Sequence, residues 1–292
     1  ALFRAKAKSR GSISIYEPEM DQQIRDRRVL HQDLSLAIRN GELSLHYQPQ
    51  AMAHPTIAGS KIIGFEALAR WMHPVRGFVP PGDFIPLAEE SGLIVEMGEW
   101  ILREACREAA SWPLPLQIAV NLSPAQFMHG DVVGLVHSIL IETGLAPDRL
   151  ELEITEGVLI EDFDRGLALL RRLKALGVRI SMDDFGSGYS SLSYLQAFPF
   201  DKIKIDRAFV VNLGRNPQSA SIVRAVIGLG HGLEMSIVAE GVETQEQLVF
   251  LADAGCDAVQ GYFLGKPLPI GQYGALVGRN PSDTMEPARK TG

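Results

Sequence analysis

The sequence predicts an α/β fold, a modified (β/α)8 barrel in which the first strand runs antiparallel to the others. Eight short β-branched or apolar runs lie along the 292 residues, and from the second run onward helical patterns separate nearly all of them. Strands that alternate with helices form a parallel sheet, and eight such units close into a TIM-like barrel. An open doubly wound sheet would also fit eight alternating units.

The expected elements follow one another in a regular order. Strand-like runs occupy residues 43–48, 61–68, 116–122, 150–155, 178–183, 202–206, 235–240 and 257–260. Helical patterns occupy residues 82–111, 131–143, 164–176, 218–232 and 244–253, with a final one near 270–278. The gap at 184–201 leaves room only for a short helix around Ser190–Leu195. A charged, helix-prone segment, residues 19–40, precedes the first strand and ends at Asn40-Gly41, a plausible helix stop.

The first gap between strands breaks the alternation. Residues 49–60 contain Pro49, Pro55 and Gly59, and they show no helical period. A parallel connection needs a dozen or more residues, which are usually helical. The first two strands are therefore expected to form an antiparallel pair.

Composition and charge narrow the class of protein. The net charge of -7 argues against broad electrostatic capture of a nucleic acid polymer, although bound metal ions could still invert the local field for a small anion. Cys106 and Cys256 form no zinc-type spacing, which favours a reducing compartment. No apolar run approaches the roughly 18 residues that span a bilayer, and no signal peptide opens the chain. A cytoplasmic domain is expected, and Ala1 within a helical pattern indicates a fragment of a longer protein.

Seven polar residues share one placement, because each closes a strand-like run just before a turn. They are Glu66, Asn121, Glu153, Asp183, Asp184, Lys204 and Glu240. In a barrel of this class all strand C-terminal ends open onto one face, so these side chains are expected to meet there. Oxygen ligands favour Mg²⁺ or Mn²⁺ over zinc, and no two histidines have an H-x-x-x-H or H-x-H spacing. With this many carboxylates, two ions about 3.5–4 Å apart are plausible.

Asp183 and Asp184 are adjacent, and adjacent side chains of a strand point to opposite faces. A backbone turn at Phe185-Gly186 would let both reach one site, where a shared cation would relieve their repulsion. The alternative is an exposed pair that caps the next helix. A lone carboxylate in an apolar strand costs several kcal/mol, so one such residue could be a structural ion pair, but a matching set points to metal.

Lys204 and Asp206 alternate with isoleucines, so both face the same side of their strand. One interpretation is a buried Lys–Asp salt bridge. The other is a lysine at the pocket mouth that holds the attacking water or a phosphate oxygen, oriented by its acidic neighbour. The sequence pattern leaves both open.

A family resemblance extends from about Gly41 to Leu276. It is carried by Tyr47-Gln48-Pro49, Glu66-Ala67-Leu68-Ala69-Arg70-Trp71, Phe84-Ile85-Pro86-Leu87-Ala88-Glu89-Glu90, Val120-Asn121-Leu122-Ser123, Glu153-Ile154-Thr155-Glu156, Asp183-Asp184-Phe185-Gly186, Lys204-Ile205-Asp206, Ala239-Glu240-Gly241-Val242-Glu243-Thr244 and Gln260-Gly261-Tyr262. With these motifs the chain resembles the EAL-domain phosphodiesterases of bacterial cyclic di-GMP signalling, which are named for the triplet Glu66-Ala67-Leu68.

The resemblance implies hydrolysis of cyclic di-GMP to linear 5′-pGpG with two Mg²⁺ or Mn²⁺ ions. It implies that the metal ligands are Glu66, Asn121, Glu153, Asp183, Asp184 and Glu240, with Asp183 between the ions. It makes Glu240, Lys204 and Glu66 the catalytic residues, with Lys204 on the metal-bound water. The dinucleotide site would be lined by Gln48, Leu68, Arg70, Asp206, Glu243 and Gln260. Arg70 is the natural phosphate clamp, since a guanidinium offers paired donors.

The resemblance also sets expectations for the rest of the chain. Residues 1–18 look like the end of a GGDEF domain, which makes 19–40 a linker helix, 41–279 the phosphodiesterase barrel and 280–292 a polar, disordered tail. The parent protein would then carry an upstream GGDEF-like domain, and any membrane anchor would lie in segments outside this chain. A homodimer is expected. Ser187 departs from the usual Gly-Thr-Gly loop but keeps the hydroxyl.

Two other functions remain to be weighed against the enzyme. A receptor that binds cyclic di-GMP without cleaving it could relay the signal through the linker helix or a dimer interface. The complete set of ligand carboxylates favours the enzyme. A barrel glycosidase with two paired glutamates fits poorly, because it leaves Asn121, the Asp pair and Lys204 without roles.

Overall fold

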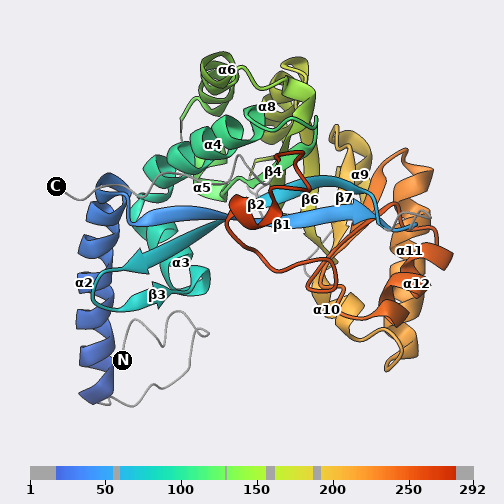
Figure 1. The fold of residues 1–292 in the computed structure, drawn as a ribbon, viewed down its shortest axis with the longest axis horizontal. Coiled ribbons are helices and arrows are strands. Elements are labelled where there is room, and N and C mark those ends of the chain that lie inside the picture. The colour runs from blue at the N-terminus through green and yellow to red at the C-terminus, as the bar shows by residue number, and fades with distance from the viewer. Residues whose placement is uncertain (1–17, 55–59, 129, 156–161, 187–191, 281–292) are drawn as a thin grey trace. The chain divides into compact units, whose positions relative to one another are not determined.

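The computed structural model describes residues 18–54, 60–128, 130–155, 162–186 and 192–280 (Figure 1). Expectations for residues 1–17, for Ser187 and for the tail from residue 281 fall outside these ranges. The chain separates into two compact units. One unit comprises Ala1–Ser44 and Arg70–Met97, and the other comprises Leu45–Ala69 and Gly98–Gly292.

The second unit is built around a closed eight-stranded barrel. Its strands are β1 (Leu43–Met52), β2 (Ile62–His73), β4 (Gln117–Asn121), β5 (Leu150–Thr155), β6 (Arg179–Phe185), β7 (Lys202–Ile205), β8 (Ser236–Ala239) and β9 (Ala258–Gln260). Neighbours pair in the order β1-β9-β8-β7-β6-β5-β4-β2, and β1 pairs with β2 to close the ring. This closure excludes the open sheet and confirms the barrel.

The direction of the first strand is also as predicted. From β2 through β9, each pair of neighbours in the ring is parallel. β1 alone runs the other way, pairing antiparallel with β9 through Gln50↔Gln260 and Met52↔Ala258. The connection from Met52 to Ile62 is shorter than the dozen or more residues that a parallel crossover needs.

Both faces of the barrel strands are buried, which explains their composition. In β5, Leu150, Leu152 and Ile154 alternate with Glu151 and Glu153, and all five are at most 1% exposed. Because strand side chains alternate, the leucines and isoleucine occupy one face and the glutamates the other. The same alternation in β7 separates its two isoleucines from its two lysines. The alternation of side chains along β5 and β7 therefore places their charged residues inside the barrel.

Helices connect the strands of this unit. They are α4 (Ile94–Ala110), which begins in the first unit, α5 (Pro124–Met128), α6 (Val132–Thr143), η1 (Pro147–Arg149), α8 (Phe163–Ala175), α9 (Leu192–Ala197), α10 (Arg207–Val211), α11 (Pro217–Gly232), α12 (Gln245–Asp253) and η2 (Ile270–Tyr273). Figure 1 shows α11 and α12 outside the barrel strands. The side chains of Asp131, Asp162, Asn216 and Thr244 cap the N-termini of α6, α8, α11 and α12.

Two helix predictions were wrong in detail. The pattern at 82–111 is two helices, because Gly92 adopts a left-handed φ of 79° and ends the first of them. The final helix near 270–278 is only the 3-10 turn η2 followed by further turns. Gly271, Gly274 and Gly278 lower the helix propensity of that segment.

The first unit contains α2 (Pro18–Asn40), the end of β2, β3 (Gly77–Val79) and α3 (Pro81–Ser91). β3 pairs antiparallel with β2, with Trp71 opposite Val79. The Trp71 ring meets Phe84 edge-on at 5.8 Å between centroids, and His73 bonds the Asp33 carboxylate at 3.1 Å. The sequence pattern missed β3, whose three residues are too few to show a period.

No helix in the described ranges has the length and apolar composition that a membrane span requires.

Two aspartates fasten the N-terminal ends of barrel strands in the same way. Asp201, just before β7, accepts a bond from the Ile180 amide of β6 at 2.8 Å. Asp257, just before β9, accepts one from the Ile237 amide of β8 at 2.7 Å. Lys174 of α8 also binds Asp201, at 2.6 and 2.8 Å. Each carboxylate thus ties its own strand to the preceding one.

Asp201→Ala should lower the free energy of unfolding by about 1–3 kcal/mol, because it removes charge-assisted hydrogen bonds and leaves a strand-end amide without its acceptor. Urea unfolding followed by circular dichroism measures the change. The matched control is Asp253→Ala, at an exposed position of α12. An equal effect of the two substitutions would contradict the fastening role.

Candidate functional site

Lys204 is the centre of a buried acidic cluster at the C-terminal end of the barrel. Its ammonium nitrogen lies 2.7 Å from a Glu153 oxygen, 2.7 Å from a Glu240 oxygen and 3.2 Å from an Asp183 oxygen. A Glu66 oxygen lies at 4.0 Å. The Lys204 side chain is only 1% exposed. Four carboxylates from four different parts of the chain thus share one buried cation.

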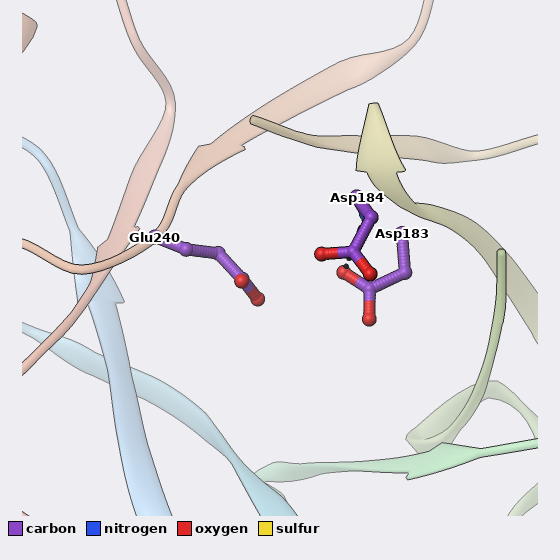
Figure 2. Close-up of side chains that lie close together, drawn as sticks. All are labelled: Asp183, Asp184 and Glu240. Atoms are coloured by element: carbon purple, nitrogen blue, oxygen red, sulfur yellow. Dashed lines mark hydrogen bonds between the residues drawn. The ribbon is translucent and has the colours of Figure 1, made fainter. Parts of the chain in front are cut away.

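Asp183, Asp184 and Glu240 converge at this end of the barrel (Figure 2). Each offers a carboxylate oxygen, and these oxygens lie within 4.8 Å of one another. Figure 2 shows the two aspartates side by side, with the Glu240 side chain extending toward them. Three converging carboxylates form a plausible set of ligands for a cation.

A bulge in β6 brings both aspartates to the same place. The register between β6 and β7 shifts between Met182 and Phe185, and Asp184 adopts a left-handed φ of 54°. Its amide donates to Asp183 Oδ1 at 3.0 Å. Such a backbone is costly for a residue other than glycine and is typical of functional sites. The turn expected at Phe185-Gly186 is therefore a bulge that begins one residue earlier.

Glu66 is held by a chain of amides. Asn121 donates to one of its oxygens at 2.6 Å, and Gln260 donates to the other at 2.5 Å. Gln260 in turn donates to Gln48 at 3.1 Å and accepts from Gln50 at 2.9 Å. The carboxylate is thus fixed in orientation before any ligand binds. Gln50 escaped sequence reasoning, although its position two residues after Gln48 places both on the same face of β1.

The sequence pattern predicted that Glu66 ends its strand, and this prediction was wrong. β2 continues to His73, so Glu66 lies within it. The pairing of β2 with β4 nevertheless stops one residue later, at Ala67↔Val120. Glu66 is therefore near the end of the barrel portion of β2, and the strand's continuation belongs to the first unit.

Burial and mutual repulsion shift the acidity of the cluster. Burial raises the pKa of Glu240 to about 7 and the pKa of Asp184 to about 6, and neighbouring carboxylates add to both effects. Burial also raises the pKa of Glu153 well above its usual value, against the opposing effect of Lys204. For Lys204, burial favours the neutral form, but the surrounding carboxylates raise its pKa well above the ordinary value. The lysine therefore stays charged.

The cluster has an excess of negative charge and, within the described part of the chain, buried oxygens without hydrogen-bond partners, both of which suit a cation. Glu66, Glu153, Asp183, Asp184 and Glu240 supply five carboxylates against the single ammonium of Lys204. Both oxygens of Glu153 and the Lys204 nitrogen are buried without an aligned hydrogen-bond partner among the described residues, although the two groups form a close ion pair. Carboxylate and amide oxygens are the ligands of hard divalent ions. The residues present fit such an ion.

The remaining predicted residues lie in three places. Asp206 is half-buried, caps α10 by accepting from Ala208 at 2.6 Å, and contributes to the raised pKa of Asp184. It is not among the carboxylates within 4.0 Å of Lys204, so the simple Lys–Asp pair is the wrong interpretation. Glu243 is exposed on the loop after β8. Leu68 and Arg70 follow Glu66 at alternate positions of β2, and Arg70 belongs to the first unit.

Comparison with known proteins identifies the family. Residues 31–267 match the EAL domain. The chain belongs to the EAL domain family. It is 44% identical over 281 residues to the bifunctional diguanylate cyclase/cyclic di-GMP phosphodiesterase MucR of Pseudomonas aeruginosa, covering 95% of this chain and 40% of MucR. It is 38% identical over 272 residues to the cyclic di-GMP phosphodiesterase PdeR of Escherichia coli, covering 92% and 40%.

Solved EAL structures share the fold. The PaMucR phosphodiesterase in complex with c-di-GMP superposes with a TM-score of 0.79 at 46% identity, covering 84% of this chain and 99% of that one. The EAL enzyme Bd1971, bound to cAMP and cyclic di-GMP, gives 0.82 at 30% identity, covering 87% and 70%. The chain spans only about a third to two fifths of the length of the curated relatives it matches.

Lys204→Met should destabilise the metal-free protein by about 3–5 kcal/mol, because it leaves buried carboxylates without their cation. Mn²⁺ should then raise the thermal unfolding midpoint more than it does in the wild type, since the competing positive charge is gone. Calorimetric melting in EDTA and in Mn²⁺ measures both. Lys61→Met, at an exposed position, is the control. A metal-free midpoint equal to that of the control would refute the compensating role of Lys204.

Proposed function

We propose that this EAL domain is a divalent-metal-dependent phosphodiesterase that hydrolyses one phosphodiester bond of cyclic di-GMP to give 5′-pGpG. The observation that carries the proposal is the complete acidic cluster around Lys204 at the C-terminal end of the barrel, where chemistry collects in this fold. The names of MucR and PdeR, and the cyclic di-GMP bound in two related structures, support the choice of substrate.

The proposed cofactor is a pair of Mg²⁺ or Mn²⁺ ions. Their ligands would be Glu66, Asn121, Glu153, Asp183, Asp184 and Glu240, with Asp183 shared between the ions. When bound, such ions lower the pKa of coordinated water and neutralise charge on the phosphate. Glu66 contributes a carboxylate that Asn121 and Gln260 already hold in place, so no reorganisation is needed at binding.

Lys204 holds its proton throughout and positions the attacking water or a phosphate oxygen. Its contacts with Glu153, Glu240 and Asp183 fix the ammonium from three sides. A charged donor fixed in advance stabilises negative charge that develops in the transition state. The surrounding carboxylates raise its pKa, which suits that role.

A further set of residues is proposed to bind the substrate. They are Gln48, Leu68, Arg70, Asp206, Glu243 and Gln260. Gln48 and Gln260 belong to the amide chain that holds Glu66, which would couple nucleotide binding to the cluster. Arg70 would clamp a phosphate through two parallel hydrogen bonds.

The wider organisation is also a proposal. Residues 1–18 would end an upstream GGDEF-like domain, α2 would be the core of the linker in 19–40, residues 41–279 would be the catalytic domain, and 280–292 a tail. MucR is named as a bifunctional diguanylate cyclase and phosphodiesterase, which supports the proposal of an upstream cyclase-type domain. The active form would be a homodimer.

Purified protein incubated with cyclic di-GMP and either Mg²⁺ or Mn²⁺ should produce pGpG, and EDTA should stop the reaction. Chromatography of the nucleotides follows substrate and product. Binding of cyclic di-GMP without turnover in either metal would refute the enzyme and favour the receptor.

Glu240→Gln should lower kcat by about 10²–10³-fold, because it removes a charged group from the cluster at nearly constant volume. Glu66→Ala should be at least as severe. Steady-state kinetics at saturating Mn²⁺ measures the loss, and Glu246→Gln on the exposed surface of α12 is the control. Near-wild-type rates in either cluster variant would rule out the two-metal assignment.

Arg70→Ala should raise KM by roughly tenfold while kcat falls much less, since a clamp binds the ground state and the transition state alike. Initial rates over a range of cyclic di-GMP concentrations separate the two constants. An unchanged KM would contradict the clamp.

A further inference from the structure

Gln247 is a buried side chain, and within the described ranges its amide bonds to backbone groups alone. Its oxygen accepts from the amide of Glu243 at 2.7 Å and from that of Thr244 at 3.1 Å. Its nitrogen donates to the carbonyl of Val210 at 3.1 Å. The residue is 8% exposed. Three hydrogen bonds from one amide thus join the backbone at Glu243 and Thr244 to the backbone at Val210, which lies 37 residues before Gln247 in the sequence.

These two segments both lead away from the acidic cluster. The first is α10, which directly follows β7 and has Asp206 as its N-cap. The second is the loop of residues 240–244, which directly follows β8 and carries Glu240 and Glu243. Gln247 therefore links the segment after Lys204 to the segment after β8.

The chemistry of the side chain exceeds what helix capping needs. Thr244 and Gln247 form a capping box at the start of α12, in which the Gln247 backbone donates to the Thr244 hydroxyl and the Gln247 side chain serves only as an acceptor. A glutamate performs that role equally well. The donor group of the amide is free for another use, and it reaches α10. A carboxylate in its place would set an acceptor against the Val210 carbonyl.

The near end of the loop has its own attachments. The Glu240 amide donates to Ile205 at 3.1 Å, and the Val242 amide donates to Gln260 at 3.0 Å. Gly241 approaches α10 so closely that an added Cβ would lie 2.5 Å from the Arg207 Cβ. Glu240 is thus anchored without Gln247, whereas the backbone of Glu243 bonds directly to it.

We propose that Gln247 is a positioning residue that fixes Glu243 relative to Asp206, and thereby sets the affinity for the nucleotide without holding the metal ligands. This rests on the proposed function, in which both acids line the substrate site. We call the three hydrogen bonds of the Gln247 amide the bridge. In the loop after β8 the bridge holds Glu243 and Thr244, and Glu243 is a proposed substrate-binding residue.

Gln247→Glu tests the bridge, because it keeps the cap acceptor and replaces the donor by a second acceptor. We expect KM for cyclic di-GMP to rise about tenfold, kcat to change less than threefold, and Mn²⁺ affinity to stay within twofold. Gln245→Glu adds the same charge at an exposed position of the same helix, and its KM should stay within twofold of wild type. Equal KM values in the two variants would overturn the proposal, as would a loss of Mn²⁺ affinity that matches the rise in KM.

Thr244→Ala separates bridging from capping. It removes the other half of the capping box and leaves the bond to Val210, so the melting temperature should fall while KM stays near the wild-type value. A rise in KM as large as in Gln247→Glu would show that capping alone matters and would overturn the bridge.

Two measurements keep the outcomes distinct. Calorimetric titration with cyclic di-GMP reads nucleotide affinity even without turnover, and a wild type that neither hydrolyses nor binds it refutes the proposed function itself. Hydrogen exchange on the wild-type protein tests the bridge without any variant. The Glu243 amide should be protected despite its exposed side chain, and exchange at the unprotected rate would overturn the bridge even if Gln247→Glu failed to fold.

Discussion

Repulsion among five carboxylates at one end of the barrel is the constraint on which the rest of the site depends. A single buried ammonium, Lys204, lies within 4.0 Å of four of them, and burial raises the pKa values of Glu153, Asp184 and Glu240. A protein that gathers such groups must hold them by other bonds. Hydrogen bonds from two amides hold Glu66, and the bulge in β6 fixes the position of Asp184. The cluster is consequently preorganised for a cation rather than assembled by it.

The barrel makes this gathering possible because its strands are buried on both faces. In β5 and β7 one face carries aliphatic side chains and the other carries charged side chains, and both faces are buried. Aspartates fasten the opposite ends of the strands at Ile180 and Ile237. Stability and chemistry therefore occupy opposite ends of the same strands, which is the usual division in barrels of this class. Gln247 adds a further connection at the C-terminal end of the strands, since it joins α10, which follows β7, to the loop that follows β8.

Much of the fold could be predicted because local sequence patterns determine it. The alternation of strands and helices predicted the barrel, and the missing helical period at 49–60 predicted the reversed β1. The rest depends on contacts or conformations without a sequence period. β3 exists because three residues pair with the end of β2, and Gly92 divides a continuous helical pattern by its backbone conformation. The convergence of the aspartates was anticipated from a turn, but the left-handed Asp184 that produces it was not. Gln50 and Gln247 were missed although the Gln48/Gln50 alternation and the Thr244-x-x-Gln247 spacing are local signals, because their bonds to Gln260 and Val210 join parts of the chain far apart in the sequence.

The central claim is that this cluster binds the divalent ions that cleave cyclic di-GMP. Anomalous diffraction from crystals grown with Mn²⁺ and cyclic di-GMP tests it most directly. The account predicts manganese peaks bounded by oxygens of Asp183, Asp184 and Glu240, with the other proposed ligands around them and a phosphate of the nucleotide beside them. Manganese bound elsewhere, or nucleotide in the barrel with no metal at these carboxylates in protein that still produces pGpG, would contradict the account.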